Sequence, residues 1–176
     1  SLRDIPIEKA FTFIEPGPVI LVTTRDGNKN NIMTISWHMV MDFTGRIAMS
    51  TGPWNHSFNT MMKTKECVIA VPGVDLAETA VRIGMCSGTD TDKFEKFALT
   101  AVPANRVRAP LIAECIACLE CRVAGYVDEH GIVILQAVQA WHDARKKEKR
   151  TFHANGDGTF VVDGETRSYR RIMKSK

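Results

Sequence analysis

Short apolar runs separated by glycine-containing turns constrain the fold of this chain more than any other feature. Residues 19–24 read Val-Ile-Leu-Val-Thr-Thr, a β-branched run typical of a strand. Asp26-Gly27 predicts a turn into a second strand over residues 31–41, and Thr44-Gly45 predicts a turn into a third over residues 46–51. Because strands joined by such short turns pair in antiparallel order, this part predicts an antiparallel meander.

The rest of the chain adds short helices and longer strands. Helical spacing begins at Asn55, a cap-type residue, and recurs over residues 75–83 and 90–97. Strand patterns cover 67–71, 112–127, 132–141 and 160–162, the last after a tight turn at 155–158. Strands therefore dominate. The pattern predicts a mainly β protein, a closed or nearly closed antiparallel β-barrel with short helices. The length of 176 residues predicts one domain over 1–176.

Composition and charge exclude several classes of protein. Hydrophobic residues make up 44% and charged residues 24%, as in ordinary soluble domains, and a net charge of +3 gives no argument for nucleic acid. No apolar stretch reaches the ~18 residues of a membrane span, and the N-terminus lacks a signal-peptide core. An odd count of 5 cysteines fits a reducing compartment, so we expect a cytoplasmic protein. Basic runs at 145–150 and 170–171 predict solvated segments, with a phosphate or acidic partner as the alternative.

The second predicted strand carries unusual polar residues. Along Asn31-Ile-Met-Thr-Ile-Ser-Trp37, alternate side chains share a face. A purely structural account with one core face and one solvent face explains Thr34 and Ser36. It explains less well why Asn31 and Trp37 share a face with Met33. Small polar groups beside an aromatic plane suit a flat ligand with polar edges.

A strand followed by a helix start forms a second candidate binding segment, residues 50–58. The unpaired amides and partial positive charge of a helix N-terminus favour a phosphate, and Ser57 and His56 can add donors. The alternative is a capped helix with nothing bound. A third segment, residues 86–94, is a small-residue loop in which Ser87 and Gly88 would let a ligand approach the backbone. Lys93 follows it, and its alternative is a surface lysine beside Asp92.

Three cysteines at C-x2-C-x2-C spacing raise the possibility of a metal site. Cys115, Cys118 and Cys121 fall on a predicted strand, where Cys118 points opposite to the other two. The outer pair would lie roughly 20 Å apart at ~3.3 Å per residue. We therefore predict buried free thiols and no metal ligands.

The order of elements and three motifs resemble the flavin reductase-like family, which includes flavoredoxin. The motifs are residues 31–37, Cys86-Ser-Gly-Thr-Asp-Thr-Asp-Lys-Phe94 and Gly156-Asp-Gly-Thr-Phe160. The resemblance covers about residues 16–160. It implies the FMN-binding split β-barrel, with Greek-key-like antiparallel strands, and a homodimer with FMN bound near the subunit interface.

The resemblance also implies a cofactor-binding set. The ring would lie on the second strand, and the phosphate at the helix start, where the family usually carries arginine or lysine followed by serine and this chain has Trp54 and Asn55. Lys93 would pair with the phosphate or approach the flavin N1–O2 edge. The full expected set is Asn31, Met33, Thr34, Ser36, Trp37, Ser50, Thr51, Trp54, His56, Ser57, Ser87, Gly88, Lys93, His142 and Phe160, with His130 a weaker candidate.

By resemblance, the expected function is an NAD(P)H-dependent flavin oxidoreductase. The chain has no G-x-G-x-x-G fingerprint after a strand, so any nicotinamide would stack directly over the flavin. Because the flavin supplies the chemistry, we assign no catalytic side chain. The alternatives are a flavoredoxin-type carrier that exchanges electrons with a redox protein and a non-catalytic flavin-binding barrel.

Overall fold

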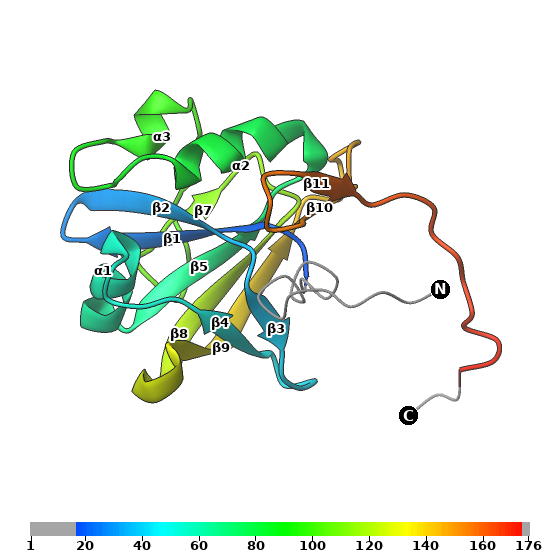
Figure 1. Cartoon of the computed structure of the whole chain (residues 1–176), viewed down its shortest axis with the longest axis horizontal. Helices are drawn as coiled ribbons and strands as arrows, with labels where there is room; N and C mark the ends of the chain where they lie inside the picture. The colour runs from blue at the N-terminus through cyan, green and yellow to red at the C-terminus, as the bar shows by residue number, and fades with distance from the viewer. Residues whose placement is uncertain (1–16, 174–176) are drawn as a thin grey trace.

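A curled antiparallel sheet forms the body of the protein (Figure 1). The computed structural model describes residues 17–173. Seven strands pair in the order β2-β1-β5-β8-β9-β4-β3, and two small hairpins, β6–β7 and β10–β11, lie outside this sheet. The elements are β1 (Ile20–Asp26), β2 (Lys29–Ile35), β3 (His38–Val40), β4 (Arg46–Ser50), α1 (His56–Thr64), β5 (Glu66–Val71), η2 (Val74–Leu76), α2 (Ala77–Gly84), α3 (Lys93–Lys96), β6 (Ala101–Val102), β7 (Leu111–Ile112), β8 (Ala117–Val127), η3 (Asp128–His130), β9 (Ile132–His142), β10 (Phe152–Ala154) and β11 (Phe160–Val162).

The predicted first hairpin is confirmed, but the predicted meander is wrong. Asp26 pairs with Lys29 across a two-residue loop, and Gly27 has the positive φ of +57° that glycine adopts without strain. The expected strand over 31–41 instead breaks after Ile35, because its partner β1 begins at Ile20 and offers no further ladder. After Ser36 and Trp37 the chain pairs with β4, so β2 and β3 lie at opposite edges of the sheet.

The sheet is a half-barrel. In the described residues its strand order is linear, and no ladder joins the edge strands β2 and β3. The architecture is therefore mainly β with few short helices, as expected, although pairing does not close the barrel. The helix predicted over 90–97 is reduced to the four-residue α3, whereas α2 and the long strand β9 lie close to their predicted ranges.

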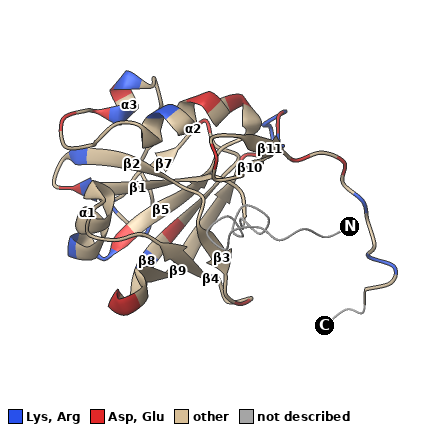
Figure 2. Cartoon of the chain, in the orientation of Figure 1, with Lys and Arg blue, Asp and Glu red and all other residues tan. Residues whose placement is uncertain are grey.

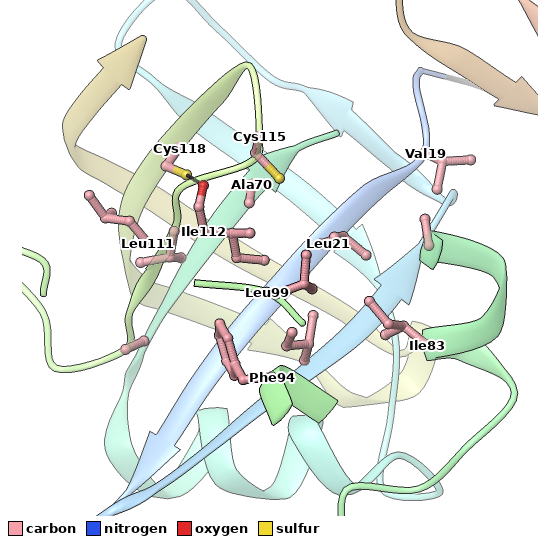
Figure 3. Packing of buried hydrophobic residues seen from close by; sticks show 14 of the residues in the cluster. Val19, Leu21, Ala70, Ile83, Phe94, Leu99, Leu111, Ile112, Cys115 and Cys118 are labelled. Carbon is pink, nitrogen blue, oxygen red and sulfur yellow. Dashed lines mark hydrogen bonds between the residues drawn. The ribbon is translucent and has the colours of Figure 1, made fainter. Parts of the chain in front are cut away.

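Two apolar clusters occupy the two faces of the sheet. Alternate residues of β1 enter each cluster: Leu21 packs with Ile83 of α2 and Phe94 of α3 (Figure 3), and Val22 packs with Phe58 of α1. Each fully buried side chain of this size contributes roughly 1.5–3 kcal/mol. The middle of β2, from Asn31 to Met33, is buried as well, so Asn31 is a polar residue inside the protein.

Cys115, Cys118 and Cys121 are buried and free, as predicted, but their directions differ from the expectation in one respect. Cys115 lies in the turn between β7 and β8, so it joins the same cluster as Cys118, whose thiol donates to the Ile112 carbonyl at 3.6 Å (Figure 3). Cys121 enters the opposite cluster. Within residues 17–173, no three His, Cys, Asp or Glu side chains are grouped to hold a metal ion.

A buried carboxylate anchors the loop between β6 and β7. Glu120 on β8 is fully buried and accepts hydrogen bonds from the amides of Asn105 at 3.0 Å, Arg106 at 2.5 Å and Val107 at 3.1 Å. The indole of Trp141 on β9 donates to it at 2.7 Å. Burial raises the pKa of Glu120, but these hydrogen bonds outweigh burial and lower it below the usual value.

Basic and acidic residues are interspersed along the chain, as the cartoon in Figure 2 shows. The basic run at 145–150 lies in a loop where Lys146 pairs with Asp75 at 3.1 Å and Arg150 with Glu148 at 2.6 Å. Arg145 also lies 3.5 Å from Asp143, so three of the five basic residues of the run pair with acidic neighbours in the same chain. None of the helices in the described range is both long and apolar enough to span a bilayer.

Candidate functional site

A cavity of about 320 Å³ opens between β2, the N-terminus of α1 and the C-terminus of α2. The loop that follows α2 and the start of α3 close its remaining side. The sequence-predicted residues that line it are Asn31, Met33, Thr34, Trp54, His56, Ser57, Ser87, Gly88 and Lys93. The three segments singled out in the sequence therefore meet at one place, although they are far apart along the chain.

Asn31 and Ser57 form a buried polar pair in the cavity wall. The Asn31 side-chain nitrogen donates to Ser57 Oγ at 2.7 Å, and the two residues are 6% and 1% exposed. This bond directs the amide, so that Asn31 Oδ1 is left as the acceptor. Oδ1 is buried and has no hydrogen-bond partner among the described residues. A buried acceptor without a donor is costly, so a donor that reached Oδ1 would stabilise this wall of the cavity.

Gly88 allows the loop after α2 to reach Asn31. A Cβ built on Gly88 would lie 2.1 Å from Asn31 Oδ1, too close for any side chain larger than hydrogen. Gly84, at the end of α2, also lines the cavity, but its Cβ would meet Thr34 at an ordinary 3.5 Å. Thr34 donates its hydroxyl to the Ala80 carbonyl at 2.6 Å, which fixes α2 against β2.

Lys93 is buried beneath the cavity rather than exposed beside Asp92. Its ammonium donates to the carbonyls of Ile32 at 2.8 Å and Ile83 at 3.1 Å, and the residue is 4% exposed. Burial lowers the pKa of Lys93, while the thiol of Cys86 and the carboxyl of Asp90 act in the opposite direction. Two of its three donors are thus used to join β2 to the C-terminus of α2.

The start of α1 faces the cavity with few charged groups. Asn55 caps the helix, as predicted, and accepts from the Ser57 amide at 2.9 Å. His56 and Trp54 lie at the rim. An anion here would be bound chiefly by first-turn amides and the helix dipole, since the site has no arginine and its lysine is bonded to carbonyls.

Other predicted site residues lie outside this cavity. Trp37 and Ser50 line an apolar recess beside β3 and β4, Ser36 lies in the link before it, and Thr51 is buried at the end of β4. His142 lines a separate cavity with Cys115 and Cys118. Phe160 packs edge-on against Phe152, with ring centres 5.9 Å apart. His130 ends η3.

Sequence reasoning missed the end of α2 as a wall of the site. Ile83, Gly84, Met85 and Cys86 line the cavity with Asn55. Ile83 and Met85 are apolar, and an apolar side chain at a helix end does not distinguish a binding residue from a core residue in the sequence. Gly84 next to the Cys86-Ser87-Gly88 run was the one available sign of a close approach.

The fold is that of a class of proteins with solved structures. An FMN-binding domain of a flavin reductase-like enzyme from Shewanella baltica has a TM-score of 0.79 at 22% identity, covering 93% of this chain and 95% of that one. The flavoredoxin of Desulfovibrio vulgaris has a TM-score of 0.79 at 23% identity, covering 88% and 91%. These likenesses define a split-barrel fold of the FMN-binding type.

The sequence places the chain in a family. Residues 14–160 match the flavin reductase-like domain. An uncharacterized protein of Archaeoglobus fulgidus is 32% identical over 149 residues, covering 79% of this chain and 84% of that protein. This chain therefore belongs to the flavin reductase-like family, as the resemblance implied.

Proposed function

We propose that this protein binds FMN in the cavity between β2, α1 and α2 and acts as an NAD(P)H-dependent flavin oxidoreductase. The observation that carries the proposal is Asn31, which lines the cavity next to a helix N-terminus and whose buried Oδ1 has no partner in the described residues. FMN combines the donors that such an acceptor needs with a phosphate that suits helix amides.

The residues of the cavity fit a flavin mononucleotide. The first turn of α1, with Ser57 and His56, would hold the phosphate, and Asn31 would accept from a hydroxyl or ring N–H. Gly88 provides the close backbone approach that a ring or ribityl chain requires. Thr34 and Lys93 support these contacts indirectly, because they fix β2 and α2 on either side.

The chain's own residues bind and orient, and the bound flavin would supply the electron transfer. Ser57 accepts from the Asn31 side-chain nitrogen and so fixes the amide, which leaves its oxygen available as an acceptor. The exposed rim at Trp54 and Met85, both 79% exposed, leaves one side of the cavity open to a second molecule. These roles require positioning rather than proton transfer.

The test is the absorption spectrum of the purified protein during anaerobic addition of NADH or NADPH. We expect a yellow protein, or one that becomes yellow with added FMN, whose band near about 450 nm bleaches rapidly on addition of the nucleotide. Free FMN with the same nucleotide is the control. A colourless protein that does not retain added FMN contradicts the proposal.

A flavoredoxin-type electron carrier is the second candidate, favoured by the structural likeness to the flavoredoxin of Desulfovibrio vulgaris. The same titration separates the two candidates. A coloured protein that remains oxidised with NADH and NADPH, but is reduced by dithionite or a reduced redox protein, supports the carrier. Colour without turnover by any donor or acceptor would indicate a non-catalytic flavin-binding barrel.

We also propose that a second copy of the chain covers the edge strand β3. Met39, Val40 and Phe43 are 57%, 74% and 97% exposed along this strand and its turn, an unusual row of apolar side chains on a sheet edge. Burial of such a row in a symmetric dimer would remove it from water.

Val40→Lys is expected to shift the protein from dimer to monomer in sedimentation analysis, because a charge would be buried without a partner. Val161→Lys, on the exposed strand β11, is the matched control and should leave the mass unchanged. A wild-type protein that sediments as a monomer at all concentrations rules out the dimer.

A further inference from the structure

Trp54 is an exposed aromatic residue that is nevertheless held in place. It is 79% exposed, yet a Cβ built on Gly52 would lie 2.1 Å from its ring atom Cζ3. A Cβ on Gly131 would lie 3.7 Å from Cη2 of the same ring. The ring therefore rests on glycine backbone at two places, which positions it, while most of its surface faces solvent.

Trp54 lies at the rim of the cavity, beside the N-terminus of α1. It precedes the cap residue Asn55 by one position and lines the cavity at the N-terminus of α1, where an anion is favoured. Asn31 lines the same cavity, and its buried Oδ1, which has no partner in the described residues, is an independent sign of a ligand there. A ligand whose phosphate lies at α1 would therefore have an aromatic plane beside that phosphate, at the open rim.

An aromatic plane beside a phosphate suits a nucleobase. Stacking of a base on an aromatic side chain is worth about 1–3 kcal/mol. A ligand whose phosphate is bound only by amides would therefore gain affinity from a stacked base. FMN ends at its phosphate and offers no base at this place. An adenylate-bearing ligand continues beyond the phosphate with ribose and adenine.

We propose that Trp54 is a stacking platform for the adenine of an adenylate-bearing ligand at this cavity. The adenylate belongs either to FAD, bound as the flavin, or to NAD(P)H, bound as the donor. The inference rests on the proposed flavin function and deepens it, because Trp54 then determines which flavin or nucleotide the site prefers.

The experiment compares ligands that differ by an adenylate group. Wild type, Trp54→Ala, Trp54→Phe and Gly52→Ala are titrated as apoprotein with FMN and with FAD. In turnover assays KM is measured for NADH and for reduced nicotinamide mononucleotide, which lacks the adenylate. In one of the two pairs, we expect Trp54→Ala to weaken binding of the ligand that carries the adenylate by about tenfold relative to the ligand that lacks it. The pairs are FAD with FMN, and NADH with reduced nicotinamide mononucleotide.

The other two variants test the ring and its position. Trp54→Phe retains a plane and should preserve most of the preference. Gly52→Ala keeps the tryptophan but displaces its ring, since the new Cβ would collide with it, and should resemble Trp54→Ala. A shift in the FAD-to-FMN ratio assigns the adenine to the flavin, and a shift in the NADH pair assigns it to the donor.

Unchanged ratios in both pairs overturn the inference while the proposed function stands, provided that the wild type still binds FMN. A changed sedimentation mass with unchanged ratios also overturns it and assigns Trp54 to a subunit contact. A wild-type protein that binds neither flavin contradicts the proposed function itself.

Discussion

Gly88→Ala is expected to weaken FMN binding by about 10–100-fold, the equivalent of roughly 1–3 kcal/mol of overpacking. The added Cβ would lie 2.1 Å from Asn31 Oδ1 and 2.3 Å from its Cγ, so either the amide or the loop must move. Movement of the amide breaks its 2.7 Å bond to Ser57 and turns the free acceptor away from the ligand. Fluorescence titration of the apoprotein with FMN measures the effect.

Gly84→Ala is the matched control for this prediction. Gly84 lines the same cavity, but its Cβ would make an ordinary 3.5 Å contact with Thr34. Because alanine also favours the helix at the end of α2, the variant should be as stable as wild type or slightly more stable. Equal FMN affinities for wild type and Gly88→Ala would remove Asn31 and its loop from the binding site.

Glu120→Gln is expected to lower the free energy of unfolding by about 2–4 kcal/mol at pH 7, because a neutral amide cannot accept from three backbone amides and an indole. The carboxylate is fully buried and receives all four of these bonds. An amide NH₂ would face donors in at least one of these places. Urea unfolding followed by fluorescence measures the difference.

The contribution of Glu120 to the free energy of unfolding is expected to depend on pH. The pKa of Glu120 is lower in the folded protein than its usual value of 4.5, so the folded state favours the ionised form. Its stabilisation is present above pH 4.5 and is lost as the pH falls through the folded-state pKa. The stability difference between wild type and Glu120→Gln should therefore shrink below about pH 4.5.

Glu129→Gln, on the exposed η3, serves as the control and should change stability by less than about 0.5 kcal/mol. A difference between wild type and Glu120→Gln that stays constant from pH 7 to pH 3 would show that the carboxylate charge is not what holds the loop. A difference near zero at pH 7 would contradict the importance of the hydrogen bonds themselves.

The sequence predicted the binding segments better than their internal geometry. Asn31, Ser57 and Gly88 were selected for separate local reasons: a polar residue in an apolar strand, a helix start and a small-residue loop. The structure brings all three to one cavity. Lys93 was expected at the surface or at the ligand, and its burial under two carbonyls had no local sign. The residues that flank Lys93 in the sequence are compatible with either a buried or an exposed side chain.

Strand boundaries show the same limit. The run from Asn31 to Met41 has continuous strand character, and only the end of the β1 ladder at Ile20 explains why it divides at Ser36 and Trp37. That division sends Trp37 to the opposite edge of the sheet, into a recess with Ser50. Residues 112–127 also have continuous strand character, so the sequence assigned Cys115 to a strand. In the structure Cys115 lies in the turn before β8, in the same apolar cluster as Cys118.

The sequence by itself determined the features that depend on a few neighbouring residues. These are the β1–β2 turn at Gly27, the cap at Asn55 and the mainly β class. Backbone propensity and the periodicity of side-chain direction depend on a few consecutive residues, so a short stretch of sequence is enough to predict them. Only the tertiary structure decided which polar groups meet, because the partner of Asn31 lies 26 residues away and is set by the packing of the whole sheet. The free oxygen that this pairing leaves on Asn31 is the feature on which the proposed site depends.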